Sequence, residues 1–135
     1  MHIALTPEQE NLQKELRDYF SQLVTPERRI ALSQASGEFG DAVVYKQVIA
    51  EIGSDGWLGI GWPKEYGGQD RSMMDQLIFT DEAAIAGVPI PYLTLNTVGP
   101  TIMRFGTDAQ KEEILPKILK GEMHFSIGYS EPGSG

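Results

Sequence analysis

The chain has 135 residues, of which 41% are hydrophobic and 22% are charged, and it carries a formal net charge of −8 and no cysteine. This length supports one modest core, and the composition excludes a disulfide framework, thiolate metal sites and the apolar run of roughly 18 residues that spans a bilayer. The acidic balance argues against non-specific nucleic-acid binding, and an N-terminus without signal-peptide character leads us to expect a cytoplasmic protein.

A capping box predicts the first helix. Thr6 is placed to act as the N-cap, Pro7 occupies the first helical position, and Gln9 follows three residues after the cap. Pro26 ends or restarts this helix, because proline lacks an N–H donor and disfavours helical angles in the residue before it. The small and polar residues 33–40 then predict a loop.

The second predicted helix covers residues 41–52, where valine and isoleucine recur four positions apart on one face. Residues 53–68 follow, and their glycine, proline and tryptophan content argues against a regular element. Within this connection, we expect Trp57 and Trp62 to anchor the chain against the bundle and not to stack on a ligand.

Ser72 and Asp75 form the N-cap signature of a third helix, which Gly87 ends. We expect Met73 and Met74, at its start, to be contacts within the bundle and not part of a cofactor site.

A fourth helix is predicted over residues 93–105, and Pro100 within it is a difficulty. A proline at that point removes a helical hydrogen bond unless it lies in the first turn. The regular helix is therefore expected to begin nearer Gly99.

Thr107 and Gln110 form another capping box and predict the clearest helix of the chain. Residues 122–129 then loosely alternate apolar and polar side chains, which predicts a short strand with no partner strand elsewhere in the sequence. The predicted fold is all-α: an up-and-down helical bundle over residues 1–122, followed at 123–135 by the first strand of a truncated β domain.

Two segments resemble the acyl-CoA dehydrogenase family. FGTDAQKEEILPKILKGE, followed by FSIGYSEPGSG, is similar to a capped helix and a flavin loop of that family, and GWLGIGWPKEYGGQ upstream is similar to its glycine-rich signature. The stretches NTVGPTIMRFGT and GYSEPGSG are more like the actinobacterial branch that acts on bulky acyl-CoA thioesters, including sterol side-chain thioesters. The resemblance implies the same helical bundle that the residue patterns predict.

The resemblance implies FAD as the cofactor. The flavin-loop positions of the family fall on Ile127, Gly128, Tyr129, Ser130 and Gly135. Backbone groups and the Ser130 hydroxyl would lie near the reactive edge of the ring, where a hydrogen-bond donor favours acceptance of hydride. Taken alone, SEPGSG is an ordinary proline-glycine turn, whereas the upstream motifs favour the flavin loop. The hydroxyl residue and aspartate with which the family continues are not in this sequence.

The resemblance also implies an acyl-CoA substrate pocket, whose far end would be lined by Ile90, Pro91, Thr94, Leu95 and Val98. Ordinary core packing of a bundle helix explains these residues equally well. Pro89 and Pro91 would shorten or bend the preceding helix and so widen such a cavity.

No catalytic residue is assigned within this chain. The catalytic glutamate of most relatives lies far downstream, in a C-terminal helical domain, and Glu65, Glu82 and Glu131 are better explained as solvated or capping carboxylates. His2 and His124 have no metal-ligand spacing, so no metal site is predicted.

The leading hypothesis is the N-terminal portion of an FAD-dependent acyl-CoA dehydrogenase, which forms a trans-2-enoyl thioester. The resemblance implies an electron-transfer flavoprotein or similar acceptor as partner, and a homo- or hetero-oligomer. One alternative is a non-catalytic subunit or interaction module that pairs with a flavin-bearing partner. A structural bundle without a ligand is a third hypothesis, which the flavin-loop sequence disfavours.

Overall fold

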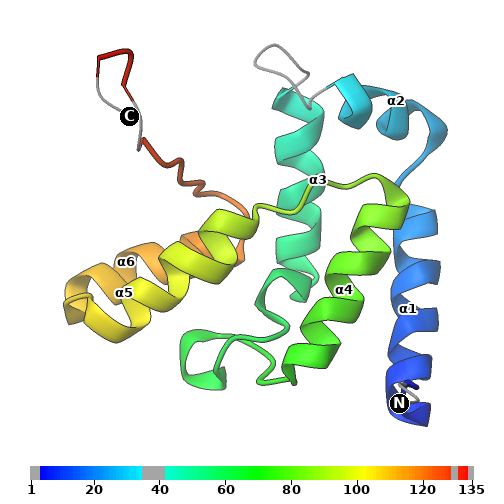
Figure 1. Ribbon diagram of the computed structural model, residues 1–135, viewed down its shortest axis with the longest axis horizontal. Helices are drawn as coiled ribbons and strands as arrows, with labels where there is room; N and C mark the ends of the chain where they lie inside the picture. The colour runs from blue at the N-terminus through cyan, green and yellow to red at the C-terminus, as the bar shows by residue number, and fades with distance from the viewer. Residues whose placement is uncertain (1–3, 35–41, 129–130, 134–135) are drawn as a thin grey trace.

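The computed structural model describes residues 4–34, 42–128 and 131–133. The described residues form helices joined by short connections (Figure 1). The α-helices are α1 (Pro7–Leu23), α2 (Pro26–Gln34), α3 (Ala42–Ser54), α4 (Met73–Ala86), α5 (Gly99–Phe105) and α6 (Asp108–Leu119). Three short helices complete the set: η1 (Trp57–Gly59), η2 (Lys64–Tyr66) and η3 (Thr94–Val98).

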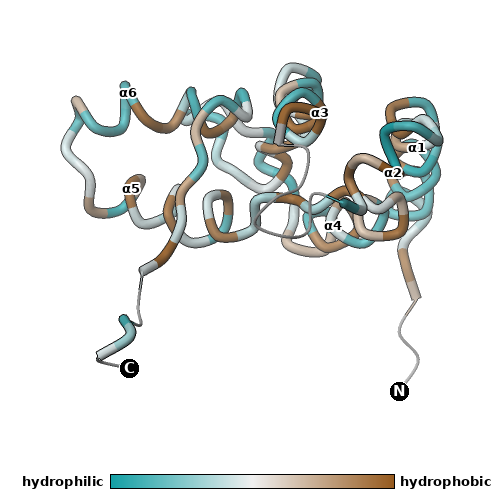
Figure 2. The backbone as a smooth tube through the Cα atoms, turned by 90° about the horizontal axis from the view of Figure 1, so that it is seen from above, coloured by the Kyte–Doolittle hydropathy of each residue, from teal (hydrophilic) through white to brown (hydrophobic). Residues whose placement is uncertain are grey.

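The helices pack as a bundle with a hairpin at one side. α1 and α4 lie side by side and point the same way, and α3 runs in the opposite direction (Figure 1). α5 and α6 form an antiparallel hairpin, which α3 and α4 separate from α1 (Figure 2). The prediction of an all-α bundle is confirmed.

The helix starts follow the predicted capping boxes. Thr6, Ser72 and Thr107 each accept a hydrogen bond from the backbone N–H three residues later, and the side chain of that later residue accepts from the cap N–H in return. Each box satisfies two backbone donors that a helix start would otherwise leave unpaired.

One continuous apolar core joins the helices, built mainly from aliphatic side chains with a few aromatic rings. Phe20 of α1 and Phe79 of α4 meet at its centre, with ring centroids 5.9 Å apart. Trp57 and Trp62 are both buried in this core, as predicted. The short helices of the glycine-rich connection are thereby fixed to the bundle.

Two glycines allow the end of α6 to approach α3 closely. A Cβ on Gly53 would lie 2.5 Å from the carbonyl carbon of Lys120, and one on Gly121 would lie 2.6 Å from the carbonyl oxygen of Ile49. Gly121 also has φ of +69°, which disfavours any side chain. Both positions therefore require glycine.

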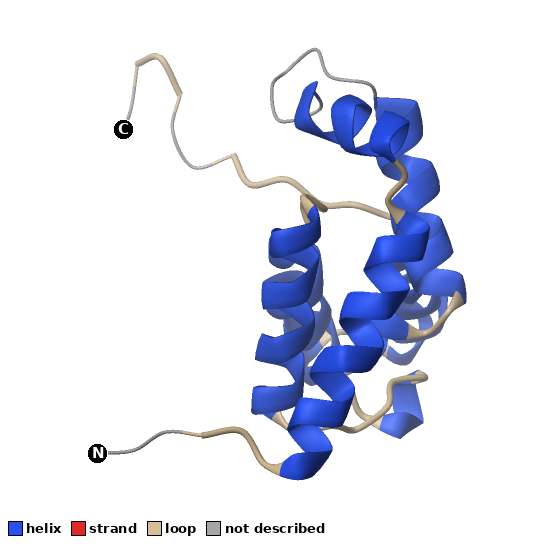
Figure 3. Cartoon of the chain, turned by 90° about the vertical axis from the view of Figure 1, so that its right-hand side faces the viewer, coloured by secondary structure: helices blue, strands red, loops and turns tan. Residues whose placement is uncertain are grey.

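The C-terminal segment differs from the prediction. Residues 123–128 form no strand, and the chain leaves the bundle as an extended segment (Figure 3). Its backbone instead makes isolated contacts: the N–H of Met123 donates to the carbonyl of Lys117, and the N–H of Phe125 donates to the Thr94 hydroxyl. A strand needs a neighbouring strand to pair its backbone groups, and none of the described residues supplies one.

Two helix ends also differ from the sequence-based expectation. Ser33 and Gln34 complete α2, where a loop was expected, and α3 continues to Ser54. Residues 35–40 of the predicted loop lie outside the described part of the chain.

Candidate functional site

The segment between α4 and α5 ends in a π-helix, η3 (Thr94–Val98), which leads directly into α5. The N–H of Gly99 donates to the carbonyl of Thr94, five residues earlier, and α5 then starts with Pro100 in its first turn. A proline ring clashes with the carbonyl four residues before it, and the wider π turn relieves this crowding. The expected start of the regular helix near Gly99 is confirmed.

Trp62 packs against this π turn from the glycine-rich connection. Its indole N–H donates to the carbonyl oxygen of Leu95 at 3.0 Å, and the side chain is 3% exposed. A Cβ on Gly99 would lie 2.2 Å from an indole ring carbon of Trp62. Trp62 and Gly99 therefore pack so closely that no larger residue fits at position 99.

An amide pair connects α4 to the π turn. The side-chain amide of Gln76 donates to the side-chain oxygen of Asn96. Gln76 also lies over Gly61, where an added Cβ would approach its side-chain oxygen to 2.8 Å. The pair stands at the boundary between two surface grooves.

The first of these, the α4 groove, has a volume of about 630 Å³ and a mainly apolar lining with an amide pair and two hydroxyls. It is lined by Met73, Met74, Gln76, Leu77, Thr80, Tyr92, Asn96 and Pro100. Met73 is 88% exposed, so the prediction that it is a bundle contact is wrong: it projects from the first turn of α4 away from the core. Leu77 and Tyr92 are exposed beside it.

The second, the Trp62 groove, has a volume of about 450 Å³ and lies on the other side of the amide pair. Its lining includes Trp62, Tyr66, Leu95, Met103 and Arg104, together with residues shared with the α4 groove. The shared residues are Gln76, Asn96 and Pro100. The amide pair and Pro100 thus form the partition between the grooves.

The five residues expected at the acyl pocket lie on or just before the π turn. Leu95 lines the Trp62 groove, and Thr94 is buried, with its hydroxyl held by the backbone of Phe125. Ile90, Pro91 and Val98 are half-buried. The structure thus brings the set together around one turn, with part of it in the core and part at a groove.

The residues expected at the flavin follow the bundle. Ile127 is 46% exposed, and Gly128 is exposed with no atom within 4 Å of an added Cβ. Tyr129, Ser130 and Gly135 lie outside the described residues. Ile127 and Gly128 both lie outside any helix.

Glu82 is a feature that the sequence-based interpretation missed. It was expected to be a solvated or capping carboxylate, yet it is 2% exposed, and Arg17 of α1 donates to both of its carboxylate oxygens at 2.7 and 3.0 Å. This contact raises the pKa of Arg17. The carboxylate is fully occupied within the α1–α4 interface, which gives it a structural role.

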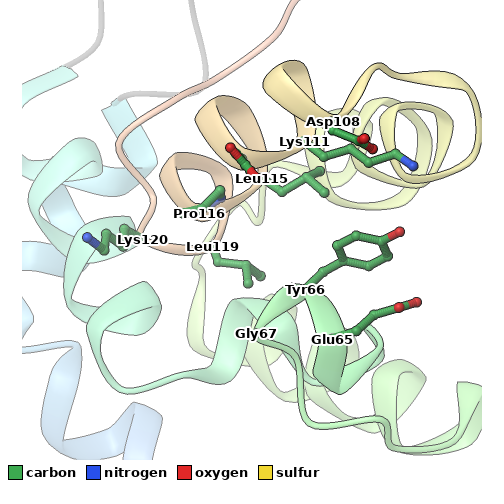
Figure 4. A pocket seen from close by; sticks show the side chains of 10 residues that line it. Glu65, Tyr66, Gly67, Asp108, Lys111, Leu115, Pro116, Leu119 and Lys120 are labelled. Carbon is green, nitrogen blue, oxygen red and sulfur yellow. The ribbon is translucent and has the colours of Figure 1, made fainter.

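A third groove, the α6 groove, lies between η2 and α6 and has a volume of about 660 Å³ (Figure 4). Its apolar floor includes Tyr66, Leu115 and Leu119, and charged side chains such as Glu65 and Lys111 surround it. None of the residues expected at the flavin or acyl sites lines it.

Neither a metal centre nor a membrane span is found in the part of the chain that the structure describes. No three His, Cys, Asp or Glu side chains there gather closely enough to hold a metal ion. No helix there combines the length and apolar character that crossing a bilayer requires. His124 contacts the backbone carbonyl of Gly121 through its ring nitrogen.

Relatives of known family align with the whole length of this chain. Residues 6–122 match the family model described as "Acyl-CoA dehydrogenase, N-terminal domain". The chain is 65% identical to the acyl-CoA dehydrogenase FadE26 of Mycobacterium tuberculosis and 50% identical to FadE29 of the same organism. Each alignment spans 100% of this chain and 34% of the relative, so the chain covers about a third of these proteins.

Solved structures of similar proteins have the same fold. A chain of the ChsE4-ChsE5 complex from Mycobacterium tuberculosis matches with a TM-score of 0.88 and 63% identity, over 100% of this chain and 33% of the other. A chain of the Tcur3481-Tcur3483 steroid ACAD matches with a TM-score of 0.87 and 48% identity, over 100% of this chain and 34% of the other. Since both the family model and the relatives cover nearly all of its length, the chain belongs to the acyl-CoA dehydrogenase family, of which residues 6–122 match the N-terminal domain.

Proposed function

We propose that the natural protein containing this chain catalyses the FAD-dependent α,β-dehydrogenation of an acyl-CoA thioester to the trans-2-enoyl thioester. The observation that carries this proposal is the 65% identity to an acyl-CoA dehydrogenase over the entire chain. In this proposal, residues 1–122 form the N-terminal helical domain, and residues 123–135 begin the next domain.

The residues proposed to hold FAD are Ile127, Gly128, Tyr129, Ser130 and Gly135. The described members fit this role, because Ile127 and Gly128 are exposed and Gly128 leaves open space beside its backbone. When bound, FAD supplies the acceptor for the hydride from the β-carbon. The backbone groups of the segment would orient the ring, and the Ser130 hydroxyl would donate a hydrogen bond to its reactive edge.

The substrate is proposed to be a bulky acyl thioester. Two observations support this: one structural relative is titled a steroid ACAD, and this chain has an apolar α4 groove and an apolar-lined Trp62 groove on either side of the π turn. Ile90, Pro91, Thr94, Leu95 and Val98 would form the wall nearest the far end of the acyl group. Apolar walls exclude water from this part of the site and orient the substrate.

The catalytic base and the electron acceptor are both proposed to lie outside this chain. The catalytic base is proposed to lie beyond residue 135, because Glu82 is fully engaged by Arg17. An electron-transfer flavoprotein or similar protein is proposed as the electron acceptor.

A second candidate function is a non-catalytic subunit of a hetero-oligomeric dehydrogenase. It is favoured by two of the similar structures, ChsE4-ChsE5 and Tcur3481-Tcur3483, each of which is named as a pair of proteins. In this alternative, the bundle contributes to the assembly while another subunit supplies the complete flavin site.

The experiment that separates these candidates is a comparison of two serine variants of the natural protein, purified with any partner that accompanies it. Ser130→Ala is expected to lower kcat for acyl-CoA-dependent dye reduction by about tenfold or more, because it removes a donor to the developing charge. Ser126→Ala, four residues earlier and exposed, serves as the matched control and should leave the rate unchanged. Equal rates for both variants in an active complex would favour the non-catalytic subunit.

A further inference from the structure

We propose that Trp62 is a positioning residue that holds the π turn, and that through this turn it sets the partition between the α4 and Trp62 grooves. The link to acyl binding rests on the proposed function, whereas the link between Trp62 and the π turn rests on the structure alone.

The carbonyl of Leu95 has no backbone donor in the helix that contains it. In a regular helix it would pair with the N–H of Gly99, but that N–H donates to Thr94. In a continued π register its partner would be the N–H of residue 100, which is a proline and has none. The indole N–H of Trp62 takes this place at 3.0 Å, inside the core.

The backbone of Trp62 is itself held by hydrogen bonds. Its N–H donates to the carbonyl of Gly59, and its carbonyl accepts from the N–H of Asp70 at 2.8 Å. A Cβ on Gly68 would lie 2.0 Å from the Trp62 carbonyl oxygen, so this glycine lets the loop close tightly over the residue. The indole therefore projects from a rigid loop and not from a mobile one.

The ring also determines where the turn lies. It occupies the space beside Gly99, at a distance that leaves no room for a side chain. The indole thus contacts the turn at both Leu95 and Gly99. Asn96 lies between these two residues, and its side-chain oxygen accepts a hydrogen bond from Gln76 of α4. The amide pair and Pro100 are the residues that both grooves share, so the position of the turn fixes the division of space between them.

Pro100 and Trp62 are therefore expected to be energetically coupled. Replacing Pro100 by alanine returns an N–H to the backbone, which can donate to the Leu95 carbonyl in the π register. It also removes the ring that disfavours the α register, in which the N–H of Gly99 donates to Leu95. The indole hydrogen bond should then matter less. If the ring acted only through packing, no such coupling would be expected. A double-mutant cycle therefore distinguishes a hydrogen-bonding role of Trp62 from a packing role.

The first test measures amide hydrogen exchange in the natural protein, in a peptide covering residues 94–105. Trp62→Phe keeps an aromatic ring but loses the N–H, and should raise exchange per amide by about tenfold, because a buried carbonyl is left unpaired. In the Pro100→Ala background the same substitution should have an effect about fivefold smaller. Trp57→Phe is the matched control and should leave this peptide unchanged. Equal effects of Trp62→Phe in both backgrounds would overturn the proposal.

The second test measures steady-state kinetics of the same variants with a bulky acyl-CoA. Trp62→Phe should raise KM by about fivefold with kcat within about twofold, because the turn contacts the acyl group and not the reacting carbons. A loss of kcat at unchanged KM would contradict the positioning role. If the wild-type protein oxidises no acyl-CoA while the exchange coupling is present, the proposed function fails and the hold of Trp62 on the π turn stands.

Discussion

Arg17 and Glu82 connect α1 to α4 with the one buried carboxylate among the described core residues. Glu82 is enclosed by the interface, whereas the Arg17 side chain is 59% exposed and reaches it from the edge. Such a pair contributes little over an apolar contact of the same shape, but loss of one partner leaves a costly buried charge. The pair therefore acts mainly to fix how the two helices meet.

Replacing only Arg17 should therefore affect stability more than replacing both Arg17 and Glu82. Arg17→Met should lower Tm by several degrees, because the Glu82 carboxylate then remains buried without a partner. Arg17→Met combined with Glu82→Leu should recover most of the loss, since no charge is left in the interface. Thermal unfolding followed by circular dichroism measures both. A double variant less stable than the single variant would show that the pair itself stabilises the fold.

Burial of individual residues was only partly predictable. The tryptophans of the glycine-rich connection were correctly expected in the core, because large aromatic side chains seldom stay exposed. Glu82 and Met73 were both misassigned, since composition favours a solvated carboxylate and a buried thioether. The environment of Glu82 depends on where α1 lies against α4, because its partner Arg17 is 65 positions away in the sequence. Met73 lies in the first turn of α4 and projects away from the core.

At the scale of elements, α6 begins with a reciprocal capping box. The Thr107 hydroxyl accepts from the N–H of Gln110 at 3.3 Å, and the Gln110 side chain accepts from the N–H of Thr107 at 2.9 Å. Gly106 precedes it, where a Cβ would lie 2.6 Å from the carbonyl oxygen of Ile102. The tight corner between α5 and α6 thus depends on Gly106, Thr107 and Gln110, which lie within five consecutive residues.

Thr107→Ala should destabilise the start of α6 by about 1 kcal/mol, because one backbone donor loses its acceptor. Thr101→Ala is the control: its hydroxyl donates from α5 to the carbonyl of Thr97 in η3, four residues earlier, a bond that contributes little to a helix. Amide exchange in a peptide covering residues 108–119 should accelerate only in the first variant. Acceleration by both variants to the same extent would contradict the capping role.

The elements differ in how well the sequence predicts them. The capped helices were predictable because each box lies within four consecutive residues. The π-helix was not, although Pro100 marked the difficulty, because its missing hydrogen bond is supplied by Trp62, 33 positions away. The strand expected over residues 122–129 is absent from its described part, residues 122–128, since alternation of side chains cannot form a strand without a neighbour to pair with.

At the scale of the whole molecule, the bundle would provide one side of the proposed site. The π turn gathers the expected acyl-pocket residues, of which Leu95 lines the Trp62 groove, and the segment that follows α6 leaves the bundle beside Thr94. The resemblance in the sequence predicted the family, which the comparisons show. It did not predict the amide pair or the partition, because these depend on the packing of α4 against the π turn.

We propose that the natural protein oxidises an acyl-CoA thioester with a bound flavin. The most direct measurement is the visible absorbance of that protein, purified from its host with any accompanying subunit and mixed anaerobically with a bulky acyl-CoA. We predict a yellow protein whose flavin absorbance is bleached within the turnover time as hydride is transferred. A colourless preparation, or a flavin absorbance that acyl-CoA leaves unchanged, would contradict the claim.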